Sequence, residues 1–356
     1  MNKLLITFLL VSNSLLAQIV FENTLTNTFD KAKNENKAVF IEFYNETCHH
    51  CQKVQPLLAS TEVSNVYNPI FVSYKINTYK GLTKEEQDFL EKHKLFFTDV
   101  PNFIYFDKNE QFLHHSSGKP DVSYIIAQSK DAFDPKKQTS QLGNRIKNGE
   151  NSLANLYQYS LLAQLNQNKP LADSIANTLY RTFDKKNLGN DTSYTILKNA
   201  VFSTKNGFFE FWLNNQNKLK NMDTGEFKGQ EIDLLKNIIT IDISDPNYKW
   251  TKQSIDDIYS KMVATNYTSK PENILVTKRI ELFDPKNPSK DVVKYLDPIM
   301  TSEVYDLDDK FYILNTVNEN FTDKKTKKTI SKYVTELKKK AEAQKNTEFV
   351  NQLNKI

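Results

Sequence analysis

AVFIEFYNETCHHC, residues 38–51, begins with seven residues that are all apolar or aromatic except one acid, and it ends in a Cys-x-x-C motif. Such a run predicts a buried β-strand, and the polar residues after it predict a turn into a helix. Cys48 and Cys51 are the only cysteines of the 356 residues, and two histidines lie between them. Glu42 is the acid inside the strand. The stretch therefore brings a carboxyl group, two thiols and two imidazoles to the end of one strand.

Two cysteines at this spacing allow three interpretations. A structural disulfide would close a loop of only a few residues, which removes little chain entropy and so stabilises little. A metal site is suggested by His49 and His50, but adjacent residues on a helix cannot all reach one tetrahedral ion, and the chain has no second ligand pair at a recognisable spacing. A redox dithiol is favoured at the start of a helix, where backbone N–H groups stabilise a thiolate. Taken alone, the stretch leaves the three interpretations open.

Residues 1–17 have the layout of a signal peptide. Lys3 supplies a positive charge, LLITFLLV at residues 4–11 forms a short apolar core, and Ala17 is a small residue before a cleavage point. The apolar core is too short to span a bilayer as a permanent helix, and a retained N-terminal anchor stays as the alternative. We therefore expect an exported protein, periplasmic or secreted, with no integral membrane segment after the signal is removed.

The composition excludes several classes of function. Glycine occurs only 8 times, and the chain contains neither G-x-G-x-x-G nor G-x-x-x-x-G-K, so no nucleotide bound by a glycine-rich loop is expected. The 47 basic and 43 acidic residues are well mixed and leave a net charge of +4, which is too small to predict nucleic acid as the partner. We expect no cofactor.

Outward from residues 38–51, the sequence predicts alternating helices and strands up to about residue 136. The predicted elements are a helix at 21–34, a strand at 38–44, a helix after Cys48, a strand at 69–77, a helix capped by Thr83, a hairpin of strands 100–106 and 111–115, and a helix at 122–133. This order predicts α/β layers with the dithiol at the carboxyl end of the first strand and the amino end of a helix.

The order of elements and several separate positions resemble the thioredoxin superfamily over roughly residues 19–136. Residues 43–51 match its strand and active-site turn, and Glu42 matches the acid buried beneath the dithiol. Lys75 matches the lysine that commonly faces that acid, and Val100-Pro101 matches the cis-proline with its preceding residue. The resemblance implies a thioredoxin-like fold, with a central mixed sheet flanked by helices.

Two departures from the superfamily pattern lie at the dithiol. Thr47 stands where the family usually has tryptophan, so the apolar cover over the site is lost. His49-His50 replaces the Gly-Pro of thioredoxins, and a histidine beside the second cysteine is similar to the more oxidising members. These departures bear on the substrate surface and on the direction of electron flow.

The resemblance implies that the site exchanges thiols and disulfides with protein substrates and with a redox partner protein. Cys48 is then the exposed attacking thiol and Cys51 the buried resolving thiol. Glu42, in an otherwise apolar strand, is expected to be buried and to accept the proton of Cys51. The ionisation of these groups is expected to be tuned by His49, His50 and Lys75. Contacts with the substrate are expected from Val100, Pro101 and Thr47. No metal is expected at the site.

The remainder of the chain carries no motif of known chemistry. Residues 137–356 contain no histidine, no second C-x-x-C, no H-E-x-x-H and no G-x-S-x-G. We expect a linker at 137–150 and an all-α domain at 151–356, because apolar residues recur there at helical spacing. Helix pairs joined by short polar turns loosely resemble tetratricopeptide or other α-solenoid repeats, without a fixed period.

The helical domain is expected to select a substrate or partner for the thioredoxin-like domain. The alternative function is that of a binding or scaffold protein whose thioredoxin-like module has little turnover.

Overall fold

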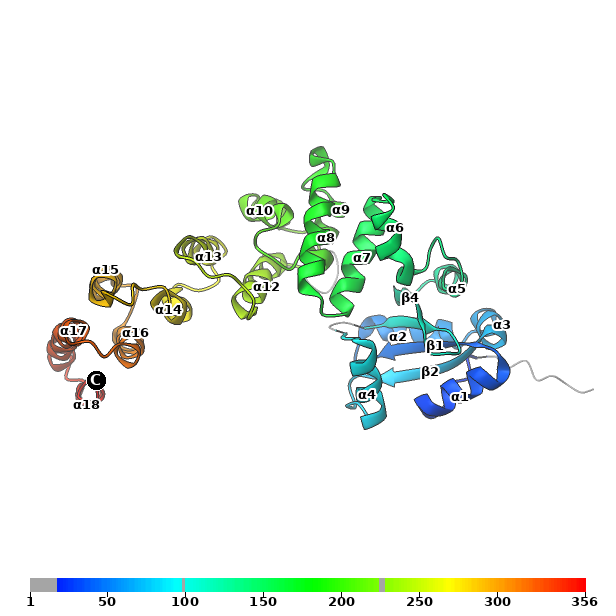
Figure 1. Cartoon of the computed structure of the whole chain (residues 1–356), viewed down its shortest axis with the longest axis horizontal. Coiled ribbons are helices and arrows are strands. Elements are labelled where there is room, and N and C mark those ends of the chain that lie inside the picture. Colours follow the sequence, from blue (N-terminus) through cyan, green and yellow to red (C-terminus); the bar gives the residue numbers. More distant parts are fainter. Residues whose placement is uncertain (1–17, 98–99, 224–227) are drawn as a thin grey trace, which may run out of the picture. The chain divides into compact units, whose positions relative to one another are not determined.

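The computed structural model describes residues 18–97, 100–223 and 228–356 (Figure 1). The chain divides into two compact units, residues 1–183 and 184–356, and each is described by itself. The predicted signal peptide at residues 1–17 lies outside the described residues.

A four-stranded mixed sheet forms the centre of the first unit. Its strand order is β2-β1-β3-β4, and the strands are β1 Ala38–Tyr44, β2 Phe71–Asn77, β3 Asn102–Phe106 and β4 Phe112–Ser117. β1 pairs parallel with β2 and antiparallel with β3, and β3 pairs antiparallel with β4. The strand predicted at 38–44 and the predicted hairpin are confirmed. Because β1 is an inner strand, its carboxyl end delivers residues 45–51 to the middle of the sheet edge.

Helices cover both faces of this sheet (Figure 1). On one face α1 (Leu25–Glu35) and α4 (Lys84–His93) pack on Val39, Ile41 and Phe43. On the other face α2 (His49–Leu58), α3 (Thr61–Ile70) and α5 (Val122–Asp131) pack on Phe40, Phe103 and Tyr105. Successive strand residues point to opposite faces, so Glu42 shares the face of Phe40 and lies under α2. The mixed sheet flanked by helices confirms the predicted fold class.

The helix α3 is an element that the sequence prediction did not separate from its neighbours. It begins because the hydroxyl oxygen of Ser60 accepts a hydrogen bond from the Val63 N–H, which caps the helix. Pro69 lies in the last turn of α3, so the strand predicted to start at residue 69 starts instead at Phe71.

Within the range predicted as a linker, the structure has a 3-10 turn, Thr139–Gln141, and a short helix, α6 Leu142–Lys147. The first unit continues with α7 Leu153–Leu165 and α8 Lys169–Thr182. Leu162 and Leu165 of α7 belong to the same apolar cluster as β1 and α1. Contacts of the sheet therefore continue beyond residue 136, and the domain bounds given by the sequence stay a prediction.

In the residues that the structure describes, the second unit consists of helices and connecting loops and has no strand. Its helices are α9 Asp191–Ala200, α10 Gly207–Asn214, α11 Gln216–Leu219, α12 Glu231–Ser244, α13 Lys252–Ala264, α14 Glu272–Ile280, α15 Pro288–Thr301, α16 Leu307–Asn320, α17 Lys324–Ala343 and α18 Thr347–Leu353. The predicted helical C-terminal region is confirmed, and a helical repeat stays a prediction. Across the described ranges, none of the helices combines the length and apolar character needed to cross a bilayer.

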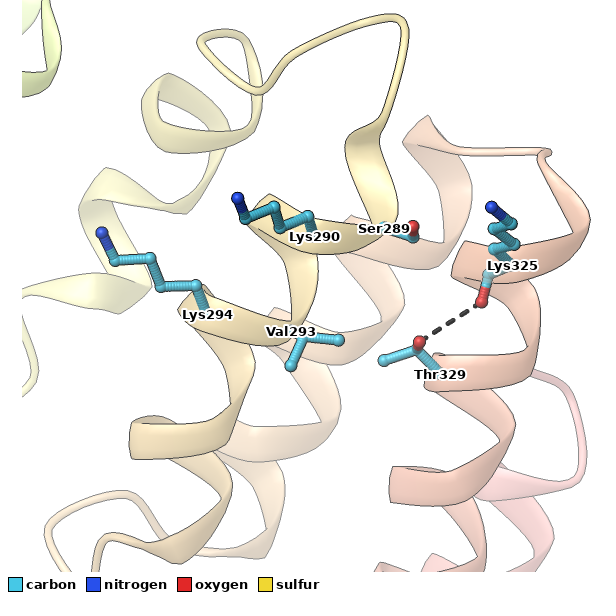
Figure 2. A pocket seen from close by; sticks show the side chains of 6 residues that line it. All are labelled: Ser289, Lys290, Val293, Lys294, Lys325 and Thr329. Atoms are coloured by element: carbon cyan, nitrogen blue, oxygen red, sulfur yellow. Dashed lines mark hydrogen bonds between the residues drawn. The ribbon is translucent and has the colours of Figure 1, made fainter.

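A shallow pocket of about 480 Å³ lies in this unit (Figure 2). Lys290 and Lys294 line it from α15 and Lys325 from α17, together with Ser289, Val293 and Thr329. The three lysine side chains make its lining cationic, and the lining carries no thiol, imidazole or carboxyl group.

Candidate functional site

The dithiol lies where the turn after β1 becomes α2. Asn45 fixes the turn, because its side-chain oxygen accepts hydrogen bonds from the backbone N–H and the hydroxyl of Thr47, both at 2.8 Å. Cys48 is the N-cap of α2, and its Sγ accepts a hydrogen bond from the Cys51 N–H at 3.3 Å. A sulfur thus takes the place that an N-cap oxygen usually fills. The unpaired N–H groups of the first turn and the positive end of the helix dipole point toward this sulfur.

The two thiols differ in their access to solvent. Cys48 is half-buried and Cys51 is only 1% exposed, and neither forms a disulfide. Burial and the hydrogen bond with Cys48 raise the pKa of the Cys51 thiol above its usual value. One reachable sulfur and one protected sulfur, one helical turn apart, form the arrangement that attack followed by resolution requires.

Glu42 lies in the apolar layer under α2 and is 0% exposed. Burial raises the pKa of its carboxyl group to about 8, against the opposing effects of Lys75 and of a hydrogen bond from Gln55. The Gln55 Nε2 donates to Glu42 Oε1 at 2.6 Å, whereas Oε2 is buried without a hydrogen-bond partner among the described residues. Glu42 is therefore a carboxylic acid that is mostly protonated at neutral pH.

Lys75 acts on Glu42 through its charge, which lowers the pKa of the buried carboxyl group. It pairs with Glu42 in the register of the parallel strands, but it is exposed. Its Nζ lies 5.2 Å from the centroid of the Phe21 ring and 5.6 Å from that of Tyr44. These distances are those of cation–π contacts. The hydrogen bond that Glu42 accepts comes from Gln55.

The loop before β3 lies opposite Cys48. The Val100–Pro101 peptide bond is cis, as the resemblance implied. The Cys48 thiol donates a hydrogen bond to the Val100 carbonyl oxygen at 3.3 Å. Gly118 packs against this loop, and its N–H donates a hydrogen bond to the Pro101 carbonyl oxygen at 2.7 Å. A Cβ at Gly118 would lie 2.7 Å from Pro101 Cγ, so no other residue fits without movement.

The histidines fall into two groups. His49 and His50 are exposed in the first turn of α2, and their ring centroids are 6.2 Å apart. His114 and His115 are buried on β4, where their Nε2 atoms bond to Gln128 at 3.1 Å and to Asn102 at 2.8 Å. Burial lowers the pKa of both, that of His115 to about 3, so both are neutral. The two adjacent histidines are therefore buried structural residues of β4, each hydrogen-bonded to a neighbouring side chain.

The residues predicted from the sequence meet around Cys48 in part. The turn with Thr47, the two cysteines and the Val100-Pro101 loop come together, Glu42 lies beneath them, and Lys75 is turned toward aromatic rings. In the stretches that the structure describes, no group of three or more His, Cys, Asp or Glu side chains is arranged to hold a metal ion.

Two residues of the site were missed by the sequence prediction, Gln55 and Gly118. Gln55 follows Cys51 by four residues on one helix face, which is a signal that the sequence does contain. Gly118 is one of only 8 glycines, but the close approach that requires it joins two loops distant in the sequence.

The match to a known family lies in the first unit. Residues 20–128 match the sequence model of the family described as Thioredoxin. Among solved structures the chain is similar to "DsbH Oxidoreductase", at 16% identity over 35% of this chain and 92% of that one, with a TM-score of 0.29. It is also similar to a thioredoxin from Thermus thermophilus, at 16% identity over 33% of this chain and 90% of that one, with a TM-score of 0.28. Among curated proteins, none matches the chain. On its match to the family model, the segment of residues 20–128 is a thioredoxin domain with a thioredoxin-like fold.

Proposed function

We propose that this protein is a thiol–disulfide oxidoreductase that exchanges its Cys48–Cys51 dithiol with disulfides of protein substrates. The observation that carries the proposal is the N-cap geometry of Cys48. Its half-buried sulfur accepts a hydrogen bond from the N–H of Cys51, whose own sulfur is shielded from solvent. Such a pair can attack a substrate and then release it.

In the reducing direction, the Cys48 thiolate attacks one sulfur of a substrate disulfide. A mixed disulfide forms, the substrate S–S bond breaks, and the second substrate sulfur leaves as a thiolate that takes a proton from water. Cys51 then gives its proton to Glu42 and attacks Cys48 Sγ. The Cys48–Cys51 bond forms and the first substrate sulfur leaves as a thiolate. The substrate disulfide gains the two electrons that the dithiol loses, and the reverse sequence oxidises a substrate.

Glu42 supports the resolving step through its position and its pKa. It is buried on the face that α2 covers, and it is close enough to Cys51 to contribute to the raised pKa of that thiol. A carboxyl group with a pKa of about 8 can both take and return a proton near neutral pH.

Export and partner selection are further parts of this proposal. The signal-peptide pattern of residues 1–17 supports an oxidising compartment, in which a dithiol persists as an exchange site. Residues 151–356 are proposed to select the substrate or redox partner. Amino-terminal sequencing of the protein from its native host tests export: a chain starting at Gln18 is expected, and a chain that still starts at Met1 contradicts cleavage.

Disulfide exchange is tested by reduction of a disulfide-bonded protein such as insulin in the presence of a small dithiol. The wild-type chain is expected to accelerate the reduction and Cys48→Ser to abolish the acceleration. Cys51→Ser is expected to accumulate a mixed disulfide with the substrate, because the resolving thiol is gone. Ala59→Ser, at the exposed end of the same helix, is the matched control for the substitution. Full activity in Cys48→Ser would falsify the proposal and favour the scaffold alternative.

A further inference from the structure

We propose that Gln55 is a positioning residue of the exchange reaction: its amide holds one oxygen of the Glu42 carboxyl group, so that the other oxygen takes the proton of Cys51. This inference rests on the proposed function, because it concerns the step in which Cys51 resolves the mixed disulfide.

The two oxygens of Glu42 have different surroundings. Oε1 accepts the hydrogen bond from Gln55 Nε2 at 2.6 Å. Oε2 has no hydrogen-bond partner among the described residues, although the side chain is 0% exposed. A buried oxygen without a donor is costly as part of a carboxylate. Oε2 is therefore the oxygen that carries the proton in the resting protein, and Oε1 is already occupied.

α2 brings Gln55 and Cys51 to the same place. The two residues are four apart, so they lie on one helix face, and the same face carries the buried Val54 and Leu58 toward the sheet. A single short helix therefore fixes the thiol and the amide in relation to one carboxyl group.

Few other titratable groups act on Glu42. Lys75 approaches from β2, Cys51 from α2 and Tyr44 from its own strand. On β3 the residue paired with Glu42 is Phe103, which has no titratable group. Since the Lys75 ammonium lies over aromatic rings, the donor held in direct contact with the carboxyl group is the Gln55 amide.

The amide has a definite effect on proton transfer. A donor on Oε1 stabilises the ionised carboxylate, and it therefore opposes the burial that raises the pKa of Glu42. With the donor present, a fraction of the molecules at neutral pH holds a carboxylate ready to accept the Cys51 proton. Without the donor, the pKa of Glu42 rises further, and a rise from 8 to 9 would lower that fraction about tenfold.

The test separates the two thiol steps with an aromatic disulfide whose thiolate product is coloured. Attack by Cys48 releases one coloured thiolate, and resolution by Cys51 releases a second. Stopped-flow absorbance follows both phases from acid to alkaline pH in the full chain. The variants are Gln55→Leu and Gln55→Met, which remove the donor at similar volume. Lys53→Met is the control, because Lys53 lies on the exposed side of the same helix.

In both Gln55 variants the first phase is expected to be unchanged. The second is expected to fall several-fold at neutral pH, with its midpoint moved to higher pH and no loss at high pH. Isotope-edited NMR of the Glu42 carboxyl carbon should show the same upward change in pKa, which a merely structural role of Gln55 would not produce. Lys53→Met is expected to match the wild type in both measurements.

The outcomes distinguish this inference from the proposed function. Release of only one thiolate by the wild-type chain would refute resolution by Cys51, and with it the proposed function. Release of two thiolates, with the same pH midpoint in the Gln55 variants as in the wild type, overturns the role of Gln55 alone. If Gln55→Leu fails to fold, the Gln55→Met profile decides.

Discussion

At the scale of single residues, Glu42 links the chemistry of the dithiol to the stability of the domain. The carboxyl group is 0% exposed in an otherwise apolar layer, and its pKa is about 8 in the folded chain against 4.5 for the exposed group. The folded state therefore holds a proton that the unfolded state releases. A protonated acid is suited to proton exchange, and an ionised acid at the same place opposes folding.

The first prediction concerns Glu42→Gln and pH. The wild-type pKa is raised on folding, so its stabilising contribution is fully present below about pH 4.5 and is lost as pH rises through about 8. The loss is on the order of 5 kcal/mol as an upper bound, from about 1.4 kcal/mol per pH unit. Glu42→Gln should remove this dependence and be more stable than the wild type at alkaline pH. Urea unfolding between pH 4 and 9 measures it, and parallel curves for the two chains would contradict the buried acid.

At the scale of elements, the site is built where three segments meet. α2 presents the two sulfurs, the loop before β3 presents the Val100 carbonyl, and the residue after β4 supports that loop from behind. The N-cap contact of the Cys48 sulfur and the backbone hydrogen bond between Gly118 and Pro101 help to hold these segments in position. The geometry at Cys48 therefore depends on a residue 70 positions later in the chain, by subtraction of the two residue numbers.

The second prediction concerns Gly118→Ala. The new methyl group would lie 2.7 Å from Pro101 Cγ and 3.2 Å from Phe103 Cζ, so the loop must move away from Cys48. We expect a loss of about 1–3 kcal/mol in the free energy of unfolding, as for other overpacked sites, and slower reaction of Cys48 with a disulfide. Urea denaturation and the first coloured phase measure the two effects. The neighbouring Ser117→Ala, at an exposed position, is the control, and equal behaviour of the two variants would refute the close contact.

At the scale of the whole molecule, the thioredoxin domain is followed by segments that belong to its own unit. Thr139 accepts a hydrogen bond from the His115 N–H at 2.8 Å and donates one to His114 Nδ1 at 3.2 Å. Leu162 and Leu165 of α7 join the apolar cluster of the sheet, and the Leu165 carbonyl oxygen accepts from the Phe96 N–H at 2.8 Å. The segment after residue 136 thus covers the sheet and satisfies the backbone of β4.

The third prediction compares two fragments, residues 18–136 and 18–183. Removing α7 takes away Leu162 and Leu165 and uncovers the apolar side chains that they pack against, and a buried leucine contributes about 1.5–3 kcal/mol. The shorter fragment should therefore be less stable by roughly 3–6 kcal/mol, and it should bind an apolar dye that the longer fragment does not. Urea unfolding of both fragments measures the difference. Equal free energies of unfolding would show that the domain ends near residue 136, as the sequence predicts.

Much of the first unit could be predicted because its signals are local. Each of three features depends on a few consecutive residues: the apolar run of β1, the Thr83 cap of α4 and the hairpin of β3 and β4. The alternation of β1 also predicts that Glu42 shares a face with Phe40. The helix α3 was not predicted, because its N-cap serine and its internal proline are residue types that also favour turns and helix ends.

The roles around the carboxyl group were harder to predict, because they depend on which side chain reaches it. The family resemblance implies that Lys75 faces Glu42. In the structure the Lys75 ammonium lies over the rings of Phe21 and Tyr44. The shorter side chain of Gln55 donates the hydrogen bond to the carboxyl oxygen from α2. A flexible, strongly hydrated lysine head remains in contact with solvent at little cost.

By itself, the sequence determined the kind of site in this protein: a buried strand, an acid within it, and two thiols at the start of a helix. These features follow from residue type and from the periods of strand and helix, which act over a few residues. Only the tertiary structure decided that one sulfur caps α2, that Gln55 rather than Lys75 donates to Glu42, and that Gly118 supports the Pro101 loop. The contacts of Gln55 and Gly118 join different elements of the fold, and packing selects among partners that the sequence leaves equally available.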